Sequence, residues 1–177
     1  TELGDFINKI PKDETKERMK MKEVLILEDK SETRKVLAGL VKEVHSDAVI
    51  YEAADEKTAY DIAMKRTIDL FLVDIILHPQ QHDDVSGGEF AQNIRKVDKY
   101  LFTPILIITS MYDPKMCMYS SVHCYQFIEK PFDFEKVKQT IQEAIRYETV
   151  QEKDRSLMFR TEGMLEMIAV SEIVYVE

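Results

Sequence analysis

Near its middle the chain reads Asp69-Leu70-Phe71-Leu72-Val73-Asp74-Ile75-Ile76, with six apolar residues around one acid, Asp74. A run this short, rich in large and β-branched residues and bounded by polar sequence, predicts a strand that is buried on both faces. Burying an isolated carboxylate costs several kcal/mol unless it is paired or bound to a metal. We therefore expect Asp74 at the mouth of the strand, where a carboxylate can take part in chemistry.

Composition limits the class of protein. The chain has 177 residues, 45% of them hydrophobic and 32% charged, as in a globular protein with one well-buried domain and a little more. It shows no membrane-spanning run and no signal peptide, so its cysteines, Cys117 and Cys124, are expected to be reduced thiols in a cytoplasmic protein without membrane contact. The net charge of −9 argues against nucleic-acid binding through bulk charge.

Short apolar runs alternate with amphipathic segments over most of the chain. Five strands are predicted, at residues 24–27, 48–51, 69–76, 104–108 and 125–128. A helix is expected after each strand, with Ser31, Asp55 and Asp133 as the N-caps of the first, second and fifth, and with Asp113-Pro114 opening the fourth. The apolar spacing of the first helix predicts a buried face made of Val36, Leu37, Leu40, Val41 and Val44, and that of the fifth predicts one made of Val137, Ile141, Ala144 and Ile145. This alternation predicts an α/β fold in which a doubly wound parallel sheet is covered by helices on both faces.

Polar side chains follow four of the predicted strands. Glu28 and Asp29 follow the first strand, Asp74 ends the third, Thr109 ends the fourth and Lys130 follows the fifth. In sheets of this kind, ligands bind beyond the carboxyl ends of the strands, where the strand order reverses. Core packing does not require carboxylates, a hydroxyl and an amine at the same end of successive strands, so this pattern predicts a functional site.

The chemistry of this group points to a metal ion and a phosphoryl group. Three carboxylates in one crevice repel each other unless a cation lies among them, and all-oxygen ligands with several waters suit Mg²⁺. Beside such an ion Asp74 could attack a phosphoryl group while Lys130 offsets the developing charge. Each residue alone has a plainer explanation, as a loop start, a turn or a cap, so the interpretation depends on the combination.

In these residues the chain resembles the receiver domain of two-component response regulators. The resemblance covers about Lys22 to Tyr147, and the order and spacing of its motifs are specific. The matching motifs are Leu25-Ile26-Leu27-Glu28-Asp29, Leu72-Val73-Asp74, Gly87-Gly88-Glu89-Phe90, Ile107-Ile108-Thr109-Ser110 and Phe127-Ile128-Glu129-Lys130-Pro131-Phe132. The resemblance implies a flavodoxin-like fold with strand order 2-1-3-4-5 and a cis peptide bond before Pro131.

The resemblance also implies the roles of the site residues. Asp74 would accept a phosphoryl group from a sensor histidine kinase, Thr109 would bond that group and Lys130 would pair with it. Mg²⁺ would be held by three carboxylates and one backbone carbonyl, those of Glu28, Asp29, Asp74 and Ile76. A receiver promotes its own phosphorylation and dephosphorylation, so we do not expect a dedicated enzyme.

Thr109 and Phe127 would form the switch. Phosphorylation adds a strongly charged group, toward which Thr109 can move, and the ring of Phe127 can fill the space that Thr109 leaves. This movement would reshape the surface of the fourth helix, fifth strand and fifth helix, the family's usual homodimer face. Phe127 stands where the family often has tyrosine, and plain core packing is its alternative role.

The polar loop after Asp74 departs from the family pattern. The family's glycine commonly follows the phosphoacceptor more closely than Gly87 follows Asp74, so this loop is longer than usual. It carries four candidate ligands for a second metal ion, His78, His82, Asp83 and Asp84, although polar insertions more often face water. The loop could also crown the phosphorylation site and alter kinase choice or phosphoryl lifetime.

The receiver is predicted to span residues 21–148. Residues 1–20 are expected to be a solvated arm or a cloning remnant, or else a short amphipathic helix that docks on a partner. A linker at residues 149–155 is expected to lead into residues 156–177.

The C-terminal segment has a hairpin signal at Glu162-Gly163 and begins another strand at Ser171. Too few strands are present to fold alone. The segment resembles the start of a LytTR-type DNA-binding domain, whose DNA contacts would then lie beyond Glu177. The alternative is a β extension that pads the receiver or mediates dimerisation.

Three functions are compatible with these residues. The first is a response regulator that controls transcription through phosphorylation of Asp74. The second is a receiver that regulates a partner protein by direct contacts without binding DNA. The third is a phosphatase of the haloacid dehalogenase type, but such enzymes need a second aspartate where this chain has Ile76.

Overall fold

The computed structural model describes residues 21–110 and 122–153 and two further strands at residues 156–161 and 164–169. In chain order its elements are β1 (Glu23–Leu27), α1 (Ser31–Val44), β2 (Val49–Ala53), α2 (Glu56–Lys65), β3 (Leu70–Val73), α3 (Ser86–Ile94), the 3-10 helix η2 (Asp98–Tyr100), β4 (Ile105–Thr109), β5 (Gln126–Glu129), α5 (Phe134–Lys153), β6 (Ser156–Thr161) and β7 (Met164–Ala169).

The first five strands form one parallel sheet in the order β2-β1-β3-β4-β5, which confirms the predicted doubly wound topology. The order reverses at β1 and β3, where Leu27 pairs with Val73. On the other side of β3, Val73 pairs with Ile107 of β4. Because of this register β1 and β3 end side by side, and the residues that follow them leave the sheet at the same edge.

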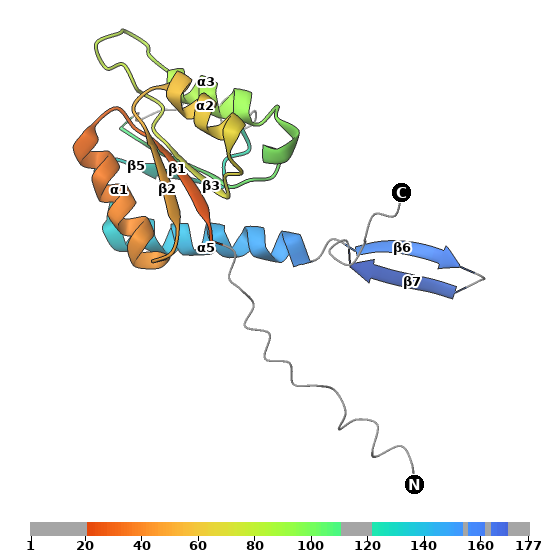
Figure 1. Cartoon of the computed structure of the whole chain (residues 1–177). Coiled ribbons are helices and arrows are strands. Elements are labelled where there is room, and N and C mark those ends of the chain that lie inside the picture. The colour runs from red at the N-terminus through yellow and green to blue at the C-terminus, as the bar shows by residue number, and fades with distance from the viewer. Residues whose placement is uncertain (1–20, 111–121, 154–155, 162–163, 170–177) are drawn as a thin grey trace.

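Successive side chains of the strands enter two apolar layers, one on each face of the sheet. The helices α2 and α3 lie on one side of the sheet and α1 and α5 on the other (Figure 1). Leu25, Leu27, Phe71 and Val73 pack beneath α2 and α3. The alternate residues Val24, Ile26, Leu70 and Leu72 pack against α1 and α5. All four side chains of β3 are fully buried, so the strand is covered on both faces as predicted.

The helices follow the predicted apolar faces closely. In α5 the whole predicted set is buried, namely Val137, Ile141, Ala144 and Ile145. In α1 the prediction holds for Leu37, Leu40 and Val41, while Val44 is only partly buried. It is wrong for Val36, which is 38% exposed. Val36 precedes the buried stripe by one position, so the rotation of the helix turns it outward.

Two of the three predicted helix caps are present. Asp55 accepts hydrogen bonds from the amide and hydroxyl of Thr58 (both 2.8 Å), and Asp133 accepts one from the amide of Lys136 (2.9 Å). The prediction for Ser31 is wrong, because α1 begins at Ser31 itself and Lys30 is the N-cap residue. The Lys30 amide instead donates to the Glu28 carboxylate (3.2 Å), so the acid after β1 shapes this turn.

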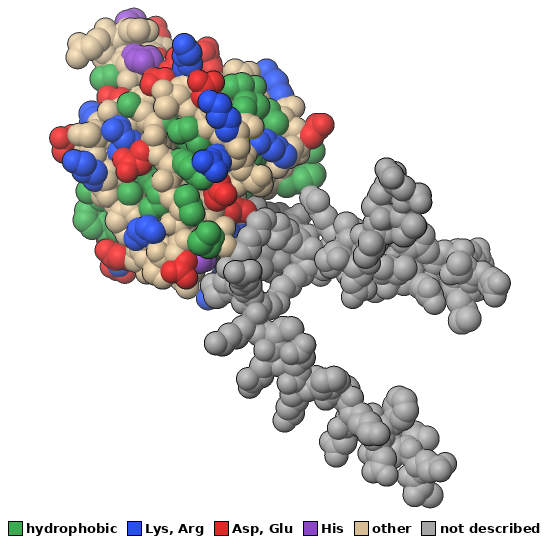
Figure 2. All heavy atoms as spheres, viewed as in Figure 1, with side chains coloured by type: hydrophobic (Ala, Val, Ile, Leu, Met, Phe, Trp, Pro, Cys, Tyr) green, Lys and Arg blue, Asp and Glu red, His purple; other side chains and the backbone are tan. Residues whose placement is uncertain are grey.

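The C-terminal strands β6 and β7 pair antiparallel, with Ser156 opposite Ala169, as the predicted hairpin requires. The fourth helix expected after Asp113-Pro114 and the strand expected from Ser171 lie outside the described residues. None of the described helices is long and apolar enough to span a bilayer. The visible face of the described part mixes acidic and basic side chains (Figure 2).

Replacing the Asp55 cap by alanine should lower the free energy of unfolding by about 1 kcal/mol, because Thr58 loses its acceptor. Urea denaturation followed by circular dichroism measures the change. Asp61→Ala is the control, since Asp61 is exposed within the same helix and alanine is the better helix former. An equal loss in both variants would contradict the capping role.

Candidate functional site

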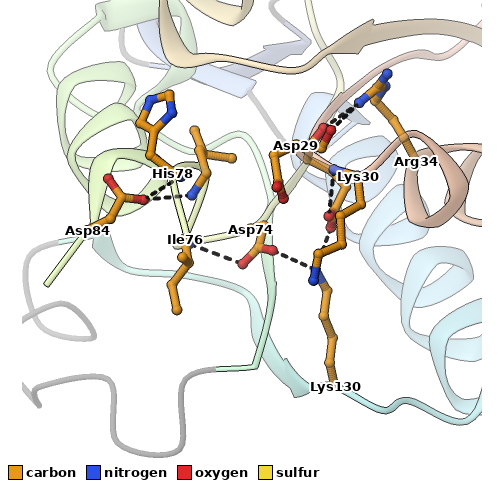
Figure 3. Close-up of polar contacts among 10 residues, drawn as sticks. Asp29, Lys30, Arg34, Asp74, Ile76, His78, Asp84 and Lys130 are labelled. Carbon is orange, nitrogen blue, oxygen red and sulfur yellow. Dashed lines mark hydrogen bonds and ion pairs between the residues drawn. The ribbon is translucent and has the colours of Figure 1, made fainter. Parts of the chain in front are cut away.

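Three carboxylates meet where the strand order reverses. Glu28 and Asp29 follow β1, Asp74 follows β3, and one carboxylate oxygen of each lies within 4.8 Å of the others (Figure 3). Glu28 is fully buried and Asp74 is 5% exposed, while Asp29 is half-buried. The structure thus brings together the three acids that the sequence places at strand ends.

Lys130 joins this group from the end of β5. Its ammonium donates to Asp74 Oδ2 (2.6 Å) and forms a second ion pair with Glu28. Its backbone amide donates to the carbonyl of Thr109 (2.8 Å), and the peptide bond that follows, to Pro131, is cis. Lys130 is therefore fixed at both ends, by its backbone to β4 and by its side chain to the two acids.

Burial and pairing act in opposite directions on these groups. Burial raises the pKa of Glu28 above its ordinary value, although the pairing with Lys130 opposes this effect. Burial alone would lower the pKa of Lys130, but its hydrogen bonds to Asp74 and Glu28 more than offset this, so that pKa is raised. The site therefore keeps a charged ammonium between two carboxylates.

The remaining predicted residues lie around this centre. The Ile76 amide donates to Asp74 Oδ1 (3.2 Å), so both oxygens of Asp74 have a donor. Thr109 is fully buried at the end of β4. Phe127 of β5 is half-buried and packs against the apolar layer beneath α2 and α3.

Arg34 was not predicted from the sequence. From α1 its guanidinium donates to the backbone carbonyls of Glu28 (2.6 Å) and Asp29 (3.3 Å), and its Nε pairs with Glu52 of β2 (3.2 Å). These bonds fix the turn that carries the two acids. An arginine on an amphipathic helix usually predicts exposure to water, so its sequence position carries no signal for this role.

Gly87 allows α3 to approach the site. A Cβ atom at this position would lie 1.8 Å from the carbonyl oxygen of Asp74, so only glycine fits without a shift of the backbone. The Gly87 amide also donates to the carbonyl of Ile75 (3.0 Å). In the sequence, the pair Gly87-Gly88 at the start of a predicted helix is the signal that indicates this close approach.

The long loop after β3 forms one wall of a pocket of about 490 Å³ beside the acids. The pocket is lined by residues 79–84 of the loop together with Asp29, Lys30, Asp74, Ile76 and Ser110. Among the described residues, the acid and histidine side chains of this loop form no metal-binding cluster, so the second metal site considered above gains no support. Figure 2 shows histidine side chains at the top of the view, where this loop projects from the domain.

The donor set at the strand ends fits a hard divalent cation. Its side-chain ligands would be carboxylate oxygens alone. Lys130 supplies a single positive charge among the three acids, two of which are buried, where uncompensated charge is costly. Few protein ligands, with room for water in the adjoining pocket, suit Mg²⁺.

The sequence of residues 24–142 matches the response regulator receiver domain, and this match covers well over half of the chain. The chain belongs to the response regulator receiver family. The chemotaxis response regulator CheY4 of Vibrio cholerae is 26% identical, with a TM-score of 0.59 over 70% of this chain and 98% of that protein. This likeness agrees with the receiver fold described above.

Two relatives carry the name sensory transduction protein LytT. The protein from Bacillus subtilis (strain 168) is 28% identical over 121 residues, which is 68% of this chain and 47% of that relative. The protein from Bacillus anthracis is 25% identical over 169 residues, which is 88% of this chain and 65% of that relative. The chain thus spans about half to two thirds of the length of these relatives.

Gly87→Ala should lower the free energy of unfolding by about 2 kcal/mol, because its Cβ overlaps the Asp74 carbonyl. Gly39→Ala is a matched control in the middle of α1, where a Cβ meets nothing within 4 Å. That variant should gain about 0.5–1 kcal/mol from helix propensity. Thermal and urea denaturation compare the two, and similar changes in both variants would refute the close-approach argument.

Lys130→Met should destabilise the metal-free protein by about 3 kcal/mol, because Asp74 and Glu28 lose their shared cation. Burial already raises the pKa of Glu28, and loss of Lys130 should raise it further. A carboxyl group with a raised folded pKa stabilises the fold when protonated, and this contribution disappears as pH rises through that pKa. The loss should therefore be smaller near about pH 5 than near about pH 8.

Urea denaturation at the two pH values, in buffer containing a chelator, measures this difference. Lys138→Met is the control, because Lys138 pairs with two exposed acids, Glu43 and Glu135. Surface pairs contribute about 1 kcal/mol or less. A pH-independent loss in Lys130→Met would mean that the buried carboxylates do not cause it.

Proposed function

We propose that this chain is a response regulator whose Asp74 accepts a phosphoryl group from a sensor histidine kinase. The observation that carries the proposal is the placement of Asp74, which is 5% exposed at the strand-order reversal and bonded to Lys130. The receiver family match supports it. The Asp74 side chain is polarised by donors on both of its oxygens, the Ile76 amide and the Lys130 ammonium.

In the proposed reaction an oxygen of Asp74 attacks the phosphorus of a phosphohistidine. A phosphorus–oxygen bond forms as the phosphorus–nitrogen bond to the kinase breaks, and the imidazole leaves with its electron pair. Lys130, already 2.6 Å from Asp74, would donate to an oxygen of the transferred group. Thr109, at the end of the neighbouring strand, would donate a hydrogen bond from its hydroxyl to another oxygen of that group.

Mg²⁺, when bound, would reduce the negative charge that phosphoryl transfer gathers at this site. The ligands would be the carboxylates of Glu28, Asp29 and Asp74 and the backbone carbonyl of Ile76. The two buried acids and the half-buried Asp29 offer the all-oxygen set that this ion prefers. The turn that carries Glu28 and Asp29 is held by Arg34 independently of any ion.

The proposed switch joins Thr109 to Phe127. In the β4–β5 register Ile107 pairs with Phe127 and Thr109 with Glu129, so the two residues lie on adjacent strands. A shift of Thr109 toward the phosphoryl group would let the half-buried ring of Phe127 move inward. This movement would change the surface of β5, α5 and the fourth helix expected from the sequence. We propose that a homodimer forms through this surface.

The proposed output is control of transcription through a LytTR-type domain that begins at residue 156. The antiparallel β6–β7 pair and the LytT names of relatives longer than this chain support this assignment. The protein would then be a cytoplasmic regulator, not a dedicated enzyme, with its DNA contacts beyond Glu177. Sequencing the coding region past Glu177 distinguishes a basic, β-rich continuation from a receiver that acts through protein contacts alone.

Incubation with Mg²⁺ and a small-molecule phosphodonor should add the mass of one phosphoryl group to the wild-type chain and none to Asp74→Asn. Intact-mass spectrometry measures both, and omission of Mg²⁺ should abolish the gain in the wild type. The asparagine amide in this variant has nearly the same shape as the carboxylate but lacks its nucleophilic charge. Equal mass gains in the two proteins, or a gain in neither, would overturn the assignment of Asp74.

A further inference from the structure

One side chain closes the loop between β3 and α3. Asp84 Oδ2 accepts hydrogen bonds from the backbone amides of Leu77 (2.7 Å) and His78 (2.9 Å) and from the Ser86 hydroxyl (3.3 Å). Its other oxygen accepts a longer bond from the Ser86 amide (3.4 Å). Asp84 therefore holds the start of the loop, just after Ile76, against its end at the first residue of α3.

The bond to Leu77 also sets the direction of the Ile76 carbonyl. The Ile76 carbonyl and the Leu77 amide belong to one peptide unit. This unit is trans, since among the described residues the cis peptide bond is the one between Lys130 and Pro131. In a trans peptide these two groups point in opposite directions. With the Leu77 amide directed at Asp84, the carbonyl of Ile76 points away from Asp84.

The acid cluster lies on that opposite side. Figure 3 shows Asp84 and His78 on one side of Ile76, and Asp74 and Asp29 on the other. The Ile76 amide is held separately by Asp74 (3.2 Å). The peptide units on both sides of Ile76 are thus restrained by a carboxylate, one in the acid cluster and one in the loop.

We propose that Asp84 is a positioning residue for the metal centre, because it aims the Ile76 carbonyl at the carboxylates of Glu28, Asp29 and Asp74. It does not touch the ion or the phosphoryl group. The inference depends on the proposed function, since Mg²⁺ binding at this cluster is what Asp84 would support. It also gives the unusual loop a role, because Asp84 holds residues 79–83 in place as the wall of the pocket beside the acids.

The position requires an ionised side chain. Three hydrogen-bond donors converge on one oxygen of Asp84, and amide bonds to a charged acceptor are stronger than bonds to a neutral one. Burial by itself would raise the pKa of Asp84, but the bonds from His78 and Leu77 lower it. Asparagine offers only one acceptor oxygen and brings two further donors, so it should hold the loop less well.

The choice of ion gives a readout that loss of stability alone would not produce. Mg²⁺ demands near-ideal octahedral geometry at short distances, whereas Ca²⁺ accepts flexible geometry with longer bonds. Displacing one carbonyl ligand should therefore weaken Mg²⁺ binding more than Ca²⁺ binding. Substitution of residues that orient metal ligands typically weakens metal affinity by about 10- to 100-fold.

The experiment titrates Mg²⁺ and Ca²⁺ into the full 177-residue chain by isothermal calorimetry. Asp84→Ala should weaken Mg²⁺ binding about tenfold or more, with a smaller effect on Ca²⁺, and Asp84→Asn should lie between it and the wild type. Asp83→Asn is the matched control. It removes the same charge from the preceding residue, whose side chain is 84% exposed and whose φ of 61° asparagine tolerates.

Hydrogen exchange at the Leu77 and His78 amides reports whether the loop has opened. Faster exchange in Asp84→Ala with unchanged Mg²⁺ affinity would overturn the inference, as would equal weakening in Asp83→Asn. If Asp84→Ala does not fold, Asp84→Asn carries the same comparison against Asp83→Asn. A wild-type chain that binds no Mg²⁺ would instead refute the metal site of the proposed function, and the positioning role with it.

Discussion

The ammonium of Lys130, held between the carboxylates of Asp74 and Glu28, is the contact on which the site depends. Two acids that are buried this deeply cannot remain charged side by side without a cation. Lys130 reaches them because its own amide is bonded to Thr109 at the end of the neighbouring strand. The sheet register therefore sets the electrostatics of the site, because the residues that follow β1, β3 and β5 carry charges that compensate one another.

Several contacts outside the charged centre hold the backbone close enough for this arrangement. Gly87 lets α3 lie against the carbonyl of Asp74, and Arg34 restrains the carbonyls of Glu28 and Asp29 from the opposite side. Asp84 holds the amides that follow Ile76. The carbonyls and amides next to the acids are thus fixed by groups that do not themselves belong to the acid cluster.

Periodicity and strand-end chemistry predict most of the fold and the centre of the site. The buried run at β3, the apolar face of α5 and the grouping of Glu28, Asp29, Asp74 and Lys130 follow from local sequence, because strand ends in a parallel sheet meet at one edge. The contacts of Arg34 and Asp84 could not be predicted in this way. They bond to backbone groups whose positions exist only after folding, and local sequence does not encode which amide or carbonyl will be within reach.

Ser31 and the long loop are two further places where local sequence does not predict the contacts that form near the site. A serine before an amphipathic run predicts a cap, yet α1 begins at Ser31 itself. The amide of the preceding Lys30 is bonded to Glu28, an acid of the site, which local sequence does not indicate. The loop was predicted as a polar insertion that faces water, and its tip does, since the side chain of His82 is 98% exposed. Its base, however, is closed by Asp84 next to a predicted metal ligand. An insertion whose ends are held together this way can vary in length at its tip without moving the backbone that follows Asp74.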